Sequence, residues 1–161
     1  GAVQTTDDAE VVFVASDSQL LRFAAKSVRP QGRSAGGMAG INLAADARVV
    51  FFGAVEAADR DQAEVVTIAV SDQTLPGADP GSGKVSDFGE FPVKGRATGG
   101  VRSQRFLKGE TELALAWVGA SPALAVGPDG ATRVLPEGGS RRDGSGTPLD
   151  MVVGSLGHRL A

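Results

Sequence analysis

The sequence of 161 residues contains no cysteine, a single histidine and no apolar run near the roughly 20 residues that a membrane-spanning helix needs. Without cysteine there is no disulfide framework and no thiolate metal site, and a cytoplasmic protein is expected. His158 has no second histidine or cysteine with which to share a metal ion, so we expect it to have a surface or packing role. Because residues 4–10 are polar, no signal peptide is expected.

Glycine is the residue that the sequence has in excess. The 23 glycines and 8 prolines are too many for long helices. Apolar residues make up 42% of the chain and charged residues 22%, which is ordinary for a globular protein. The length fits one domain or a few small structural repeats, and such a chain can fold without a metal or a disulfide. This composition predicts a turn-rich, all-β fold.

Three apolar segments of β type recur along the chain, at residues 11–15, 65–70 and 123–126. Their first residues are 54 and then 58 positions apart, and turn-forming residues follow each of them. After the first turn, residues 21–26 alternate between apolar and more polar positions, with Arg22 and Lys26 on the polar side. This period of two predicts a strand with one buried face and one face toward water.

A glycine-rich segment comes next in each unit. Residues 32–37 and 95–100 both read Gly-Arg-x-x-Gly-Gly, and residues 136–146 keep the glycine and arginine content without the register. Further strands are expected at residues 48–55, 113–118 and 149–153. Three unrelated hairpin groups in one sandwich are the alternative, but the matching spacing and motif favour a repeat. We therefore expect one domain, 1–161, of blades packed side by side, at about residues 10–56, 64–119 and 122–160.

Charge is sorted along the chain, although the net charge is −3. Residues 20–35 hold four basic residues and no acid, and residues 92–108 hold five basic residues and no acid. If the units repeat in space, these segments line up as a stripe, and a phosphate backbone binds such a stripe with release of counterions. Glycine loops also let backbone N–H groups approach phosphates closely.

The basic stripe predicts which residues contact DNA phosphates. The main candidates are Arg22, Lys26, Arg29, Arg33, Lys94, Arg96, Arg102 and Arg105, and the weaker ones are Lys108, Arg133, Arg141 and Arg142. The alternative is that these side chains form solvated faces that pair with acids of a neighbouring unit. Matching positions of nine basic residues in two segments without an acid favour contact with DNA.

Enzyme motifs fail when their required patterns are compared with the sequence. Residues 77–85 resemble a phosphate-binding P-loop, but the first glycine falls one position early and Val85 replaces the residue that would hold magnesium. Asp59, Asp61 and Glu64 imitate part of a calcium loop that lacks its glycine and its later glutamate. No serine lies in a nucleophile-elbow pattern. We therefore predict a non-catalytic module with no metal and no cofactor of its own.

Two of the units resemble a known family. Residues 22–43 and 90–101 are similar to the repeats in C-terminal domains of bacterial type IIA topoisomerase A subunits, those of DNA gyrase and topoisomerase IV. The resemblance covers residues 10–118 well and the last unit loosely. It implies an all-β β-pinwheel, a propeller-like arrangement of about three four-stranded blades in an open or partial ring, with DNA bent around a basic rim.

The resemblance also implies a biological setting. At the nucleoid, the domain would bind and bend or wrap double-stranded DNA without sequence preference, within an A subunit that works with an ATPase B subunit. ATP and magnesium would act elsewhere in that enzyme, and the chain has no tyrosine that could serve as the DNA-cleaving nucleophile. The gyrase box Gln-(Arg/Lys)-Arg-Gly-Gly-Lys-Gly is missing, with residues 31–37 as the nearest segment, which favours a topoisomerase IV type over a partial gyrase domain. The competing function is a structural or protein-interaction blade array without nucleic acid.

Overall fold

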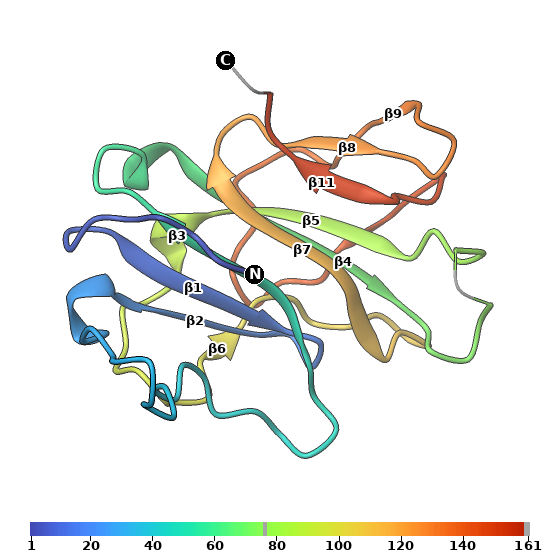
Figure 1. Ribbon diagram of the computed structural model, residues 1–161. Coiled ribbons are helices and arrows are strands. Elements are labelled where there is room, and N and C mark those ends of the chain that lie inside the picture. Colours follow the sequence, from blue (N-terminus) through green and yellow to red (C-terminus); the bar gives the residue numbers. More distant parts are fainter. Residues whose placement is uncertain (76, 160–161) are drawn as a thin grey trace.

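The computed structural model describes residues 1–75 and 77–159, and it is built almost entirely from β-strands (Figure 1). Within these described residues, eleven strands form three antiparallel sheets that lie next to one another. The helical segments in the described part of the chain are three short 3-10 turns, η1 (Ala25–Ser27), η2 (Arg60–Gln62) and η3 (Phe88–Glu90). The predicted all-β fold is confirmed.

The first sheet has the strand order β3-β1-β2-β6. Its strands are β1 (Glu10–Ala15), β2 (Gln19–Ala24), β3 (Val49–Val55) and β6 (Val101–Arg102). A tight turn joins β1 to β2, in which Ser18 adopts a φ of 69°. The alternating residues therefore form the second strand of a hairpin. The next strand of this sheet, β3, follows the long glycine-rich segment.

The second sheet repeats this arrangement with the order β10-β5-β4-β7. Its strands are β4 (Ala63–Val70), β5 (Ser82–Asp87), β7 (Glu112–Ala120) and β10 (Thr147–Pro148). The strand pair β4 and β7 is the longest in the molecule and lies at its centre (Figure 1).

The third sheet has three strands in the described residues, in the order β11-β8-β9. They are β8 (Leu124–Val126), β9 (Thr132–Arg133) and β11 (Ser155–Gly157). The predicted strand at residues 149–153 is wrong, because the chain pairs as β10 just before this stretch and as β11 just after it. Apolar composition marked the region but could not tell which residues reach a partner strand.

Each four-stranded sheet takes its fourth strand from the next unit. β6 belongs to the second glycine-rich segment and pairs with β2, so that Leu20 faces Val101. β10 follows the third glycine-rich segment and pairs with β5 in the same way, with Gly83 facing Thr147. The sheets are therefore tied together by backbone hydrogen bonds as well as by side-chain packing.

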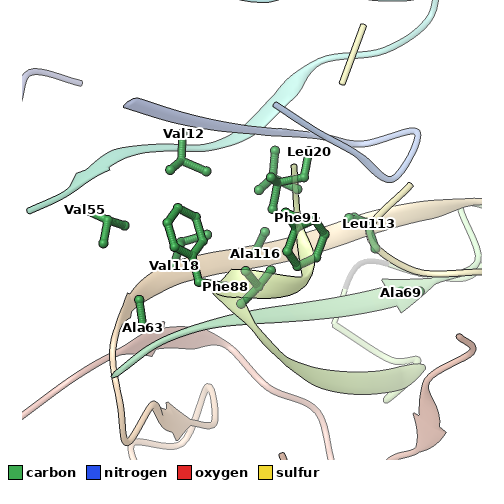
Figure 2. Close-up of a cluster of buried hydrophobic side chains, with 12 residues drawn as sticks. Val12, Leu20, Val55, Ala63, Ala69, Phe88, Phe91, Leu113, Ala116 and Val118 are labelled. Atoms are coloured by element: carbon green, nitrogen blue, oxygen red, sulfur yellow. The ribbon is translucent and has the colours of Figure 1, made fainter. Parts of the chain in front are cut away.

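An apolar cluster fills the space between the first two sheets (Figure 2). Phe88 and Phe91, at η3, point into it and are 0% and 1% exposed. They lie between Val12 and Leu20 of the first sheet and the β7 side chains of the second, including Val118. Burying two phenylalanine side chains stabilises the fold by about 2–3 kcal/mol each, which makes this the main joint between these sheets.

A second cluster joins the second and third sheets around Trp117, which is buried. A third cluster lies on the opposite face of the first sheet, where Val11, Leu21 and Phe23 are buried. Phe13 stacks near both Phe23 and Phe52 on this face. The apolar residues of the first sheet are therefore divided between two faces.

A buried polar network links the glycine-rich loops to the sheets. Ser18 Oγ donates to the carbonyl of Gln104 at 2.6 Å and accepts from the Gln104 N–H at 2.8 Å. The Gln104 side chain accepts from Thr67 Oγ1 at 2.7 Å and donates to Ser82 Oγ at 2.9 Å. Because buried polar groups need partners, this network fixes the position of one loop against both sheets.

Candidate nucleic-acid interface

The three glycine-rich loops form one continuous surface, which we call the glycine-loop surface and define as residues 29–43, 92–108 and 136–146. The first and second loops meet where the Asn42 N–H donates to the Thr98 carbonyl at 3.0 Å. The second and third loops meet in the same way, where the Arg105 N–H donates to the Gly144 carbonyl at 2.9 Å. The repeat in sequence is therefore also a repeat in space.

Glycine is required where a loop runs against the sheet that it completes. Gly100 has a φ of 79°, in the left-handed region that glycine adopts without strain. A Cβ atom at this position would lie 2.5 Å from the carbonyl oxygen of Leu20. Only a residue without a side chain lets the loop come close enough to pair with β2.

Positive charge is concentrated on the glycine-loop surface. Its three segments hold nine basic residues and two acids, Glu137 and Asp143. The rest of the chain, by the same count, holds 7 basic and 17 acidic residues of the totals of 16 and 19. The overall negative charge therefore conceals a surface with a large excess of cations, which attracts a polyanion.

Four of the predicted contact residues are exposed on this surface without a side-chain partner in the described part of the chain. They are Arg29, Arg33, Arg102 and Lys108. A cation that has no carboxylate or carbonyl partner is free to neutralise a phosphate. These four side chains are the strongest candidates for contact with DNA.

Five more predicted residues lie on the surface and contact other residues of it, three of them between loops and two within one loop. Arg96 donates to the Ala39 carbonyl of the first loop, and Arg105 Nε donates to Ser145 Oγ of the third loop at 3.1 Å. Arg142 donates to the Arg102 carbonyl at 3.3 Å, and Lys94 Nζ donates to the Gly100 carbonyl at 3.1 Å. Arg141 is 84% exposed and lies 3.6 Å from Asp143. A guanidinium has several donors, so these contacts leave others free for a phosphate.

Lys84 supports this surface from below, and sequence reasoning missed it. Its side chain is 2% exposed, and Nζ donates to the carbonyls of Arg141 and Arg142 at 2.8 and 2.5 Å. Burial lowers the pKa of Lys84 to about 8, and nearby Asp143 acts in the opposite direction. Lys84 holds the third loop in place from beneath. The signal in the sequence was a lysine inside the strand run of residues 82–87.

The prediction for Arg22 is wrong. Its guanidinium is buried, with Nε 3.1 Å from the carboxylate of Glu10 and Nη1 donating to the Phe88 carbonyl at 2.8 Å. It also lies over the Phe88 ring, 4.3 Å from the centroid. Burial lowers the pKa of Arg22, and the charge of Glu10 opposes this. The second sheet covers what the alternation suggested was a face toward water, so Arg22 joins two sheets.

Two further predicted contacts lie elsewhere. Arg133 is paired with Asp129 at 2.6 Å and donates to the Val152 carbonyl, so the prediction of a DNA contact there is wrong. Lys26 is exposed in η1 and lines a small hollow with Asp7 and Asp8 rather than the glycine-loop surface. At these two positions the basic side chains lie near acidic residues and do not extend the basic stripe that the sequence suggested.

The remaining sequence motifs are explained by structure. Ser82–Asp87 is a strand, so the P-loop-like residues do not lead into the helix that a P-loop needs. His158 is exposed, with its ring centroid 5.9 Å from that of Trp117. Among residues 1–75 and 77–159 there is no helix with the length and apolarity that a membrane crossing requires.

Comparison with known families agrees with this geometry. The sequence profile of the DNA gyrase C-terminal domain, a β-propeller, matches residues 6–56 and 81–111, about half of the chain. The chain belongs to this DNA gyrase C-terminal domain family. The matched segments include the whole of the first and second glycine-rich loops. The resemblance drawn from these loops is therefore confirmed.

Members of this domain family occur in longer topoisomerase subunits. The topoisomerase subunit TopoM of Mycolicibacterium smegmatis is 30% identical over 142 residues, which are 88% of this chain and 18% of TopoM. The A subunit of DNA gyrase from Salmonella typhimurium is 32% identical over 103 residues, 64% of this chain and 10% of the gyrase chain. The chain thus spans less than a fifth of the length of these relatives.

Solved C-terminal domains have the same fold as this family member. The crystal structure of the C-terminal domain of DNA topoisomerase IV matches with a TM-score of 0.72 and 19% identity, over 93% of this chain and 46% of that one. The E. coli ParC C-terminal domain matches with a TM-score of 0.66 and 16% identity, over 94% of this chain and 61% of that one. The DNA gyrase A C-terminal domain matches with a TM-score of 0.59 and 16% identity, over 89% of this chain and 44% of that one. The predicted β-pinwheel fold is confirmed.

Proposed function

We propose that this domain binds double-stranded DNA without sequence preference and bends or wraps it, as part of a bacterial type IIA topoisomerase A subunit. The observation that carries the proposal is the glycine-loop surface, where nine basic residues and two acids lie on three loops that contact one another in series. Its exposed arginines are spread over successive units, as a duplex lying across several units requires.

The chemistry of this surface suits phosphates rather than bases. Each cation that neutralises a phosphate releases condensed counterions, so affinity grows with the number of contacts and falls with salt. Contacts of this kind position a duplex and carry no sequence information. The glycines of the loops, Gly36 and Gly99 among them, leave backbone N–H groups open to approach by phosphate oxygens.

The proposed setting is the cytoplasmic nucleoid. The domain would guide a DNA segment toward the rest of its own A subunit. The A subunit would work with an ATPase B subunit, and ATP and magnesium would act outside this domain. The missing gyrase box favours the topoisomerase IV type of parent enzyme. Because the chain has no tyrosine, DNA cleavage belongs to another part of that enzyme.

Ligation of nicked circular DNA in the presence of the domain tests this proposal. Wrapping or bending with a consistent hand shifts the distribution of topoisomers after ligation, and bending alone raises the rate at which short linear duplexes close into circles. If neither changes at a salt concentration where basic proteins bind DNA, the domain does not act on DNA, and a protein-interaction module is the better interpretation.

A further inference from the structure

The three units have equivalent edge positions, which the strand pairing identifies. Leu20 faces Val14 in the first sheet, Gly83 faces Ile68 in the second, and Thr132 faces Val126 in the third. Two residues before each of them the backbone has a positive φ, at Ser18 (69°), Gly81 (63°) and Gly130 (80°). The outer edge of β9 is therefore built as the outer edges of β2 and β5 are.

In the first two sheets this edge receives the loop of the next unit. The carbonyls of Ser18 and Arg22 accept the N–H groups of Ser103 and Lys94 at 2.7 and 2.9 Å. The carbonyls of Gly81 and Val85 accept those of Leu149 and Ser140 at 2.9 and 3.1 Å, in the same register. The incoming loop covers the edge, so that Arg22 and Val85 are 8% and 4% exposed.

In the third sheet the same edge is open. The carbonyls of Gly130 and Val134 accept no hydrogen bond from the described residues. Val134, at the position of Arg22 and Val85, is 90% exposed. Leu124 is 40% exposed, whereas Val12 at the equivalent position is 0% exposed. An unpaired edge next to an exposed apolar face is a ready site for another strand.

The first glycine-rich loop of the chain corresponds to the loops that pair with these edges, but it pairs with no edge in the described part of the chain. The Gly-Arg-x-x-Gly-Gly motif places Gln31 and Gly40 where the second loop has its donors Lys94 and Ser103. Gly37 has a φ of 81°, close to the 79° of Gly100, so the first loop keeps the shape of the strand-donating loop. Backbone N–H groups of Gln31 and Gly40 donate no hydrogen bond within residues 1–75 and 77–159.

The face of the first sheet beside this loop is apolar and hollowed. A hollow of about 330 Å³ lies over it, and its lining combines apolar side chains such as Phe13, Met38 and Phe52 with polar ones such as Asp7 and Arg96. The open edge and this hollow lie at opposite ends of the row of three sheets, because the second sheet separates the first from the third (Figure 1). An acceptor at one end and a donor at the other fit a head-to-tail contact.

We propose that a second copy of this chain occupies the open edge, with its residues 31–40 paired to residues 130–134 of the first copy. The joint repeats the register of the two internal joints, so the N–H groups of Gln31 and Gly40 meet the carbonyls of Val134 and Gly130. It buries Val134 and Leu124 against the apolar face of the partner. It also brings the third loop of one copy next to the first loop of the other, which extends the cationic surface.

Sedimentation equilibrium of the full chain over a concentration series tests the joint. We expect species of at least twice the 16.3 kDa of one chain, and a single species of 16.3 kDa at the highest soluble concentration would overturn the proposal. Val134→Asp places a charge in the joint and weakens association at least about tenfold, because a buried unpaired carboxylate is costly. Leu75→Asp is the matched control, since Leu75 is 79% exposed and lies outside both edges.

A mixing experiment tests the head-to-tail geometry. Gly37→Ala damages only the donating loop, because a Cβ at the equivalent Gly100 would collide with the carbonyl of Leu20, whereas at Gly37 nothing lies within 4 Å in the single chain. Val134→Asp damages only the accepting edge. At a concentration near the dissociation constant of the native chain, each variant alone should stay largely monomeric with an unchanged circular dichroism spectrum. An equimolar mixture should associate, since one good donor then meets one good acceptor. Association of either variant alone, or a mixture that stays monomeric, would contradict the pairing.

Discussion

At the scale of single residues, two arginines from the same basic segment of the sequence have different roles because their surroundings differ. Arg33 is exposed on the first glycine-rich loop, and Arg22, eleven positions earlier, is buried between two sheets. The ion pair with Glu10 compensates the charge of Arg22, and its Nη1 donates to the Phe88 carbonyl. Removing Arg22 leaves Glu10 with Arg60 as its remaining ion-pair partner among the described residues, at 3.3 Å, and leaves the Phe88 carbonyl without its donor.

Arg22→Met therefore should destabilise the fold by about 3 kcal/mol, since Glu10 loses a partner and the Phe88 carbonyl loses its donor. Urea denaturation followed by circular dichroism measures the change. Arg33→Met is the matched control, for which a change within about 0.5 kcal/mol is expected at an exposed site. Equal effects of the two substitutions would show that Arg22 does not hold the two sheets together.

Lys84 predicts a dependence of stability on alkaline pH. Below its folded pKa of about 8, Lys84 is protonated in both states, and the cost of burying the charge is fully present. Between pH 8 and the ordinary value of 10.5, the unfolded chain holds a proton that the folded chain has lost, so the free energy of unfolding rises with pH. Urea denaturation between these values should show a rise in the native chain that is absent from Lys84→Met. Parallel curves for the two proteins would contradict this account.

At the scale of elements, the sequence predicted the strands of the first two units well, because alternation and apolar runs are local signals. It could not predict that β6 and β10 complete the sheets of preceding units, since pairing between distant segments leaves no local pattern. The same limit explains the error at Arg22, whose cover comes from the next unit. That the loop cations gather in neighbouring segments could be seen from the sequence because charge sorting is a local signal, and their contact with DNA stays a prediction. The surroundings of Lys84 and Arg133 depend on contacts with residues further along the chain.

Strand exchange between units can be tested by cross-linking, because the chain has no cysteine of its own. Gln19 and Arg102 are paired across β2 and β6, so Gln19→Cys with Arg102→Cys should form a disulfide readily under mild oxidation. Gln19→Cys with Thr147→Cys is the control, because Thr147 lies in β10 and pairs with Gly83 of the second sheet. Mass spectrometry after alkylation distinguishes the two. A free thiol pair in the first variant, or an equally fast disulfide in the control, would refute the exchange.

At the scale of the whole molecule, an acidic chain presents a cationic surface because the repeat collects its basic residues in loops that lie side by side. The acids are held in other segments, including the region of residues 44–79. Net charge therefore says little about whether this domain binds DNA, and the arrangement of charge decides it. Packing between sheets and exchange of strands keep the loops in register, so the fold itself supports the surface.

The salt dependence of duplex-DNA affinity tests this central claim most directly. Fluorescence anisotropy at several salt concentrations should give a logarithm of affinity that falls linearly with the logarithm of salt. Arg33→Gln and Arg102→Gln should each reduce the slope by about 0.9, the contribution of one phosphate contact. Arg48→Gln, which removes a charge that is 58% exposed and paired with Glu112 away from the glycine-loop surface, should leave the slope unchanged. Slopes that are the same in all four proteins, or an affinity that does not respond to salt, would contradict the account.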